Sequence, residues 1–149
     1  IAYKIVETRK RKMIRTSTQL AQIIIDAIPR HALSKQKIHP ATRVFMALRI
    51  AVNQELERLK TFMEQAPDFL NPGGRLCVLS FHSLEDRIVK QQLKALEKGC
   101  SCPPQLPMCV CGQKPQVSIL TKKVVRPTTE EAIANPMARS TRLRAAEKL

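Results

Sequence analysis

A chain of 149 residues is long enough for one domain with its own core, and 44% of its residues are hydrophobic. Only 3% are aromatic and Trp does not occur in the sequence, so the core is expected to be aliphatic. The formal net charge of +14 and the pI near 10.1 predict a polyanionic partner, with nucleic acid as the first candidate and a solvated basic surface as the alternative. No stretch has the character of a membrane span or a signal peptide, so we expect a cytoplasmic protein without a membrane partner.

The positive charge is concentrated at the two ends of the chain. Residues 1–43 carry ten Lys and Arg side chains against Glu7 and Asp26, an excess of eight positive charges. Near the other end only Glu147 opposes a second basic group: Arg139, Arg142, Arg144 and Lys148. Contacts from such groups to phosphates give affinity and salt dependence but little sequence specificity. We therefore expect both ends to contact a nucleic-acid backbone.

The first forty residues predict a small helical pair followed by a basic linker. Residues 1–12 have the character of the end of a helix, and they start without Met or a cap, as expected for a part of a longer protein. Thr16 and Gln19 have the spacing of a capping box before a second helix, which Pro29 ends. Residues 30–40 are interpreted as a linker that leads into a new element.

The middle of the chain predicts a long helix, a strand and a second helix. Apolar residues recur at three- and four-residue spacing from residue 41 to about 65, which predicts one amphipathic helix. A Pro-Gly-Gly turn at 72–74 precedes the strand of residues 75–81, whose nearly continuous apolar run indicates burial on both faces, with Cys77 in the core. Gly99 is placed to end the helix that follows.

The last third of the chain predicts two more strands. Residues 116–125 and 140–146 have strand composition, and the connection between them is polar and interrupted by Pro. Three strands with helices on both sides amount to half of a doubly wound sheet. The sequence therefore predicts an α/β fold whose sheet edges stay exposed unless other sequence covers them.

The carboxyl end of the first predicted strand is the first place to look for chemistry, because ligands of doubly wound sheets bind beyond such ends. Ser80, His82 and Ser83 lie there. Ser83 has an alternative role as a helix N-cap, with Asp86 at the third helical position. Asp86 in turn is either a catalytic carboxylate or a partner of the helix dipole. His82 and His39 act as base, ligand or RNA-stacking group, or only hydrogen-bond a backbone group.

Four cysteines lie within twelve residues of a Pro-rich loop: Cys100, Cys102, Cys109 and Cys111. Four thiols are enough to close a tetrahedral site, for which zinc is the natural metal. The pairs are C-x-C and not the more specific C-x-x-C, so the sequence favours reduced thiols without metal, and zinc stays the alternative. Disulfides rank below both.

Three segments carry a resemblance to one family. The first contains K-I-H-P-A-T-R at 37–43 and A-L-R-I-A-V-N-Q-E-L at 47–56. The second contains G-G-R-L and S-F-H-S-L-E-D-R-I-V-K within 73–90, and the third N-P-M-A-R-S and L-R-A-A-E within 135–147. Together they resemble the MraW family of ribosomal RNA methyltransferases over nearly the whole chain, and the eleven-residue string in the second is highly specific.

The resemblance implies a class I, S-adenosylmethionine-dependent methyltransferase with a Rossmann-like sheet, which modifies N4 of a cytosine in the decoding region of small-subunit ribosomal RNA. Residues 1–40 would be the rear part of a helical, RNA-facing insertion, and residues 41–149 the carboxyl-terminal half of the methyltransferase domain. The family's glycine-rich loop and ribose-binding acid have no counterpart in this sequence. We therefore assign no residue to the cofactor and expect the chain alone to be inactive.

On this resemblance, Ser80, His82 and Ser83 line the cytosine side of the pocket, and Asp86 is a further catalytic candidate. The residues expected to hold phosphates are Lys37, His39, Arg43, Arg87, Arg139 and Arg142. The expected partner is small-subunit ribosomal RNA or the small ribosomal subunit, and a homodimer is left open. Two other classes also stay open, a non-catalytic basic RNA-binding module and a zinc-stapled structural domain.

Overall fold

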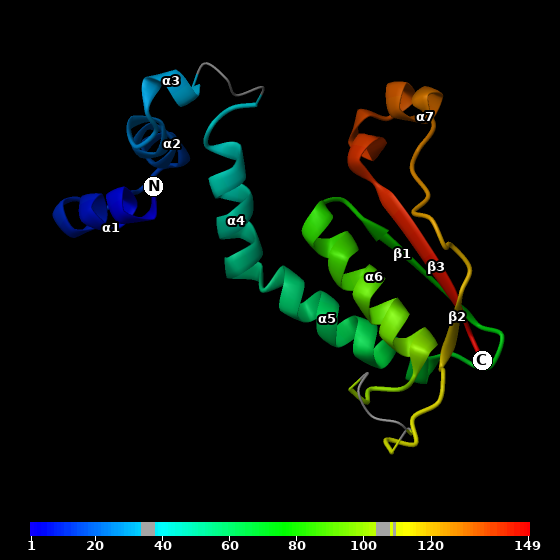
Figure 1. Cartoon of the computed structure of the whole chain (residues 1–149). Coiled ribbons are helices and arrows are strands. Elements are labelled where there is room, and N and C mark those ends of the chain that lie inside the picture. Colours follow the sequence, from blue (N-terminus) through cyan, green and yellow to red (C-terminus); the bar gives the residue numbers. More distant parts are fainter. Residues whose placement is uncertain (34–37, 104–107, 109) are drawn as a thin grey trace. The chain divides into compact units, whose positions relative to one another are not determined.

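The computed structural model describes residues 1–33, 38–103, 108 and 110–149 (Figure 1). Two of the predicted site residues, Lys37 and Cys109, lie outside the described residues. The chain forms two compact units, which divide between Glu55 and Leu56. The functional boundary expected near residue 40 concerns the family's insertion and stays a prediction.

The described part of the first unit is helical, and its elements are α1 (Ala2–Arg11), α2 (Ser17–Asp26), α3 (Arg30–Leu33) and α4 (Thr42–Asn53). The predicted capping box at the start of α2 is confirmed. Thr16 Oγ1 accepts a hydrogen bond from Gln19 N at 3.2 Å, and Gln19 Oε1 accepts one from Thr16 N at 3.3 Å. Helix α3 lies in the segment that was predicted to be a linker, where Pro29 O accepts the first bond of the turn from Ala32 N.

The prediction of one helix over residues 41–65 is wrong, because α4 ends before α5 (Glu55–Gln65) begins. Gln54 lies between them with a left-handed φ of +52°, which interrupts the helical hydrogen bonds. Glu55, directly after the break, accepts hydrogen bonds from Nε and Nη2 of Arg49 at 2.9 and 3.1 Å. The break is hidden in the sequence because the apolar spacing continues through it and no Gly or Pro marks it.

The second unit contains a three-stranded sheet (Figure 1). Besides α5, its elements are η1 (Ala66–Phe69), β1 (Arg75–Ser80), α6 (Ser83–Lys98), β2 (Val117–Ile119), α7 (Thr129–Ala134), η2 (Pro136–Ser140) and β3 (Arg142–Lys148). The strand order is β1-β3-β2, and β3 is antiparallel to both neighbours. Strands β1 and β2 therefore run in the same direction, with α6 in the connection between them.

The strands agree with the predicted α/β class but differ from it in pairing and length. Doubly wound sheets are mostly parallel, whereas both neighbouring pairs here are antiparallel because β3 is inserted between β1 and β2. The strand predicted over 116–125 forms only at Val117–Ile119, followed by a single bridge from Val125 to Leu143. The strand predicted over 140–146 begins later, because η2 continues to Ser140.

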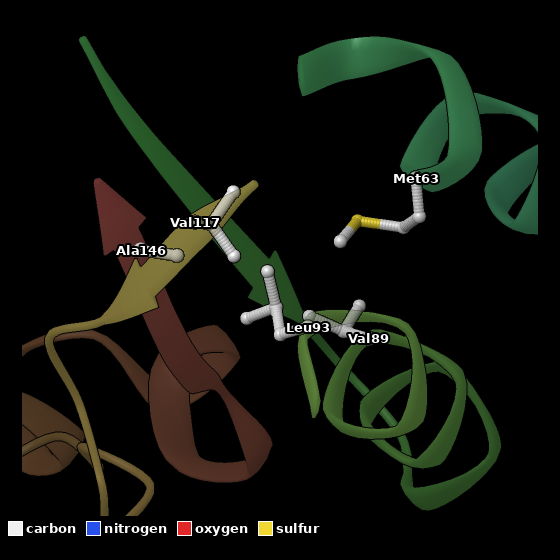
Figure 2. Packing of buried hydrophobic residues seen from close by; sticks show 5 residues of the cluster. All are labelled: Met63, Val89, Leu93, Val117 and Ala146. Atoms are coloured by element: carbon white, nitrogen blue, oxygen red, sulfur yellow. The ribbon is translucent and has the colours of Figure 1, made fainter. Parts of the chain in front are cut away.

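The core of the second unit lies where α5 and α6 cover one face of the sheet. Figure 2 shows its five most buried apolar residues, all at most 1% exposed: Met63 from α5, Val89 and Leu93 from α6, Val117 from β2 and Ala146 from β3. Burying a side chain of this kind contributes about 1.5–3 kcal/mol for the larger ones. The core therefore fixes α6, and with it the turn from which α6 starts.

Strand β1 is covered on one face only, so the expectation of burial on both faces is wrong for the described chain. Leu76 and Val78 pack against the core, whereas Leu79 is 55% exposed and Cys77 is exposed and not a core residue. This alternation has the two-residue period of a sheet with one open face. Strand β1 is also an edge of the described sheet, which agrees with the exposed edges that were predicted.

Among the described residues, no helix is both long and apolar enough to cross a membrane.

Candidate functional site at the end of strand β1

The turn between β1 and α6 is held by a reciprocal pair of side chains. His82 is the N-cap of α6, and its Nδ1 accepts a hydrogen bond from Glu85 N at 3.3 Å. In return, Glu85 Oε2 accepts the backbone N–H groups of Phe81 and His82 at 2.8 and 3.2 Å. The predicted cap, Ser83, is instead the first helical residue, and Glu85 takes the third helical position that was assigned to Asp86. Hydrogen bonds within the turn therefore satisfy its backbone N–H groups at Phe81, His82 and Glu85.

The two nitrogens of His82 have different surroundings. Because Nδ1 accepts a hydrogen bond, the neutral ring carries its hydrogen on Nε2. Nε2 is buried and lies 3.4 Å from Glu85 Oε1 without forming a hydrogen bond to any described residue. The arrangement therefore favours a positioning role for His82, which holds the turn in one conformation.

The turn presents an aromatic ring to solvent. Phe81 is 57% exposed and Ser83 is also exposed, whereas Ser80 at the end of β1 is only 2% exposed. The three predicted residues Ser80, His82 and Ser83 are thus brought together, but they face different environments. The sequence analysis placed Phe81 at the end of the strand but gave it no role in the site. The available signal was an aromatic residue directly after the strand in a chain that has few of them.

Asp86 belongs to a buried ion-pair network that joins α6 to β3. Arg144 Nε donates to Asp86 Oδ1 at 2.7 Å, and Arg142 Nη1 donates to Asp86 Oδ2 at 3.1 Å. Asp86 and Arg144 are 8% and 9% exposed. Burial raises the pKa of the Asp86 carboxyl, but the hydrogen bonds and charges of Arg144 and then Arg142 outweigh it, so this pKa lies below its ordinary value. Near neutral pH Asp86 has no proton to give, and its carboxylate fixes the base of the turn.

The residues predicted to hold phosphates differ in their exposure to solvent and in whether they form hydrogen bonds within the chain. His39 and Arg43 belong to the first unit, Arg87 and Arg139 to the second, and all four are exposed. His39 Nδ1 accepts a hydrogen bond from Ala41 N at 3.2 Å, which orders the start of α4. Arg142 is half-buried through its bond to Asp86. Arg43, Arg87 and Arg139 therefore fit a role in phosphate binding better than Arg142 does.

A second cluster lies beyond the other end of α6. The thiol sulfurs of Cys100, Cys102 and Cys111 all lie within 4.8 Å of one another. Helix α6 has 16 residues and is therefore about 24 Å long. The thiols and the turn at Ser80–Ser83 are thus separate sites.

All 149 residues match the model of the MraW methylase family. The chain belongs to this family. Over 98% of its length, the chain aligns with 47% of the ribosomal RNA small subunit methyltransferase H of Desulforapulum autotrophicum. The aligned residues are 58% identical. Over its whole length it is 58% identical to 48% of the protein of that name from Desulfosudis oleivorans, and 52% identical to 45% of the one from Thermomicrobium roseum. The chain spans about half the length of the curated relatives it matches. The match confirms the resemblance given by the three sequence segments.

Methylases of this family use S-adenosylmethionine, and the residues at the end of β1 do not fit this cofactor. A nucleoside needs a glycine-rich turn for close backbone approach and a carboxylate for its ribose hydroxyls. Residues 80–83 contain no glycine. Both nearby carboxylates are engaged, Glu85 with the turn amides and Asp86 with two guanidinium groups. The described turn therefore lacks the groups that would hold this cofactor.

Proposed function

We propose that the protein carrying this chain transfers a methyl group from S-adenosylmethionine to N4 of a cytosine in the decoding region of small-subunit ribosomal RNA. The observation that carries this proposal is the family match, together with relatives up to 58% identical that are named ribosomal RNA small subunit methyltransferase H. The partner is then small-subunit ribosomal RNA or the small ribosomal subunit, and the activity belongs in the cytoplasm.

In this proposal the present chain supplies the RNA side of the enzyme, and other residues hold S-adenosylmethionine. The open edge of β1 supports this division, because an unpaired strand edge is suited to pairing with a further strand. Residues 41–149 then form the carboxyl-terminal half of the methyltransferase domain, and residues 1–40 the rear of an RNA-facing insertion. The chain alone has no methyl transfer.

The chemistry requires that a weak nucleophile be held in place. The lone pair of a cytosine amine is delocalised into the ring, so orientation of the amine and acceptors for its protons have to lower the barrier. The base must also leave its stack, which favours an unpaired region of RNA. The exposed ring of Phe81 is suited to stack on the extruded base, and Ser83 offers a hydroxyl beside it. His82 caps the helix that follows the turn, and Ser80 is buried at the end of β1.

The basic side chains supply affinity for the RNA backbone. The exposed groups at Arg43, Arg87 and Arg139 are each expected to contact a phosphate, with smaller contributions from His39 and Arg142, which have internal partners. Lys37 stays a prediction of the sequence. Each lost phosphate contact should reduce the dependence of the logarithm of affinity on the logarithm of salt concentration by about 0.7–0.9.

Isothermal titration of S-adenosylmethionine tests the division directly. We expect no binding heat with the 149-residue chain and one-site binding with a protein extended at its amino end to the length of the relatives. The extended protein should convert one cytosine of small ribosomal subunits to N4-methylcytosine, as read by mass spectrometry of RNA digests. Binding by the short chain would contradict the division, and a cofactor-binding extended protein that leaves N4 unmodified would contradict the substrate.

A non-catalytic RNA-binding module is the second candidate, and the basic first unit favours it. The last turn of α1 carries Arg9, Lys10 and Arg11, and residues 1–43 have an excess of eight positive charges. Such a surface binds phosphates without any chemistry. Tight, salt-dependent RNA binding by an extended protein that never binds S-adenosylmethionine would support this second candidate over the first.

A further inference from the structure

We propose that Cys100, Cys102 and Cys111 bind one zinc ion, which staples the loop between α6 and β2. The sulfurs of Cys100 and Cys111 are 3.8 Å apart, and all three sulfurs lie within 4.8 Å of one another. Zinc–sulfur bonds of about 2.3 Å in a tetrahedron place the sulfurs about 3.8 Å apart. A disulfide would require about 2.05 Å. Cys111 Sγ donates a hydrogen bond to Cys100 Sγ at this separation, and the same separation suits two thiolates on a common ion.

The fold closes the loop at its base without help from the metal. Gly99 has φ +67°, and a Cβ atom there would lie 2.4 Å from Lys114 C and 2.5 Å from Pro115 N. Beside this contact, Gln116 N donates to Leu96 O at 2.9 Å. Cys100 follows Gly99 directly, and so the first thiol is placed by α6 itself. A site whose ends are already held costs less ordering entropy when it binds an ion.

The described residues of this loop differ in how exposed their side chains are. Met108 and Val110 are 77% and 78% exposed, whereas the three cysteines are half-buried. Val110 N donates to Cys102 Sγ at 3.4 Å, and such backbone donors stabilise a thiolate. The described loop therefore turns its apolar side chains outward and its sulfurs inward. This is the reverse of a hydrophobic core and the usual arrangement of a small structural zinc site.

Ligand type and spacing indicate which metal is bound. Sets of thiolates select zinc or an iron–sulfur cluster. An iron of a [2Fe–2S] or [4Fe–4S] cluster binds at most two cysteines, whereas these three sulfurs are close enough to share one ion. Each thiol releases its proton to solvent as its Zn–S bond forms. Cys109 lies outside the described residues and remains the sequence's candidate for the fourth ligand.

This site is structural and does not depend on the proposed function. It lies beyond the end of α6 that is opposite the Phe81 turn, about 24 Å away along the helix. The ion is therefore out of reach of a base at that turn, and its role is to hold the loop closed. The sequence alone favoured metal-free thiols because of the C-x-C spacing. The convergence of three sulfurs at a closed loop base changes that conclusion.

Metal analysis of the chain, purified under reducing conditions with zinc in the medium, tests the proposal. We expect about one zinc per chain, retained through dialysis against a weak chelator, and Zn–S distances of about 2.3 Å by X-ray absorption. The C100S/C102S/C111S variant should lose at least about ten-fold of this zinc. C77S is the matched control, because Cys77 is an exposed thiol on β1 outside the cluster, and it should keep the full amount.

A second readout covers the case in which the triple variant fails to fold. Cobalt added to the metal-free wild-type chain should give the visible bands of tetrahedral cobalt with a thiolate charge-transfer band, and one equivalent of zinc should abolish them. A reduced, folded wild-type chain that binds neither zinc nor cobalt would overturn the proposal. Equal loss of zinc in C77S and in the triple variant would overturn it as well.

Discussion

The two ends of helix α6 are held in different ways. At its amino end, His82 and Glu85 satisfy each other's backbone groups, and Asp86 is buried against Arg144. At its carboxyl end, a left-handed Gly99 and close backbone packing turn the chain, and beyond them thiols face one another. At the first end Nε2 of His82 is buried without a hydrogen-bond partner among the described residues, whereas at the second end three thiol sulfurs converge. The difference shows that hydrogen bonds within the chain hold the turn at β1, and it agrees with the proposal that an ion orders the cysteine loop.

The largest effect is expected from breaking the ion-pair network at the amino end. Asp86→Ala leaves the buried guanidinium of Arg144 without its carboxylate, which should lower the free energy of unfolding by about 3–5 kcal/mol. Asp68→Ala, at an exposed Asp in η1 of the same unit, is the control and should change it by less than about 0.5 kcal/mol. Denaturant unfolding measures both. Equal effects for the two variants would show that the network does not hold this end.

The same network predicts how stability depends on acid. The pKa of Asp86 is lower in the folded chain than in the unfolded one, so its contribution is fully present above the unfolded value of about 3.9 and is lost as the pH falls below it. Unfolding free energies measured between pH 7 and pH 3 should therefore fall more steeply for the wild type than for Asp86→Ala. Parallel curves would contradict the assignment of the charged form to Asp86.

At the carboxyl end, the close approach at Gly99 is expected to matter more than its φ angle. Gly99→Ala adds a Cβ atom within 2.6 Å of Lys114 and Pro115, and should destabilise the chain by about 3 kcal/mol from strain and displaced backbone. Gly73→Ala also has a left-handed φ, +81°, but meets nothing within 4 Å, and should cost about 1–2 kcal/mol. Thermal unfolding of the two variants separates the effect of the close backbone approach from that of the left-handed φ angle. A Gly99→Ala effect no larger than that of Gly73→Ala would exclude the tight loop base.

The smallest effect separates two candidates for the N-cap. His82→Ala removes the acceptor for Glu85 N and should cost about 0.5–2 kcal/mol. Ser83→Ala, at the exposed first helical position, should change stability by less than about 0.5 kcal/mol. Chemical denaturation of both variants checks the order. A larger loss of stability in Ser83→Ala than in His82→Ala would show that Ser83, and not His82, is the N-cap.

Features that depend on short sequence motifs were predicted correctly, whereas two features without such a motif were missed. The capping box at Thr16 and the end of α6 at Gly99 follow from short motifs, and both are confirmed. The helix break at Gln54 was missed because apolar periodicity passes through it unchanged. The antiparallel insertion of β3 was missed because pairing direction is set by contacts between distant segments.

The candidate site shows the same limit. The strand end and its cluster of Ser and His residues could be read from the sequence, since a buried-type strand leads directly into a helix. The capping role of His82 and the burial of Asp86 could not, because they depend on side-chain geometry and on β3, 56 or more residues away along the chain. The exposed ring of Phe81 likewise became apparent only when β1 was seen to have an open face.

The central claim is that the turn after β1 presents the target base and does not hold the methyl donor. The most direct measurement compares Phe81→Ala with Phe69→Ala, an exposed Phe of η1, in the amino-terminally extended protein. For Phe81→Ala we expect a fall of about 10- to 100-fold in kcat/KM for small-subunit RNA, the worth of one stacking contact, with an unchanged Kd for S-adenosylmethionine and no effect of Phe69→Ala. Normal methylation by Phe81→Ala, or a loss that appears only in the affinity for S-adenosylmethionine, would contradict the account.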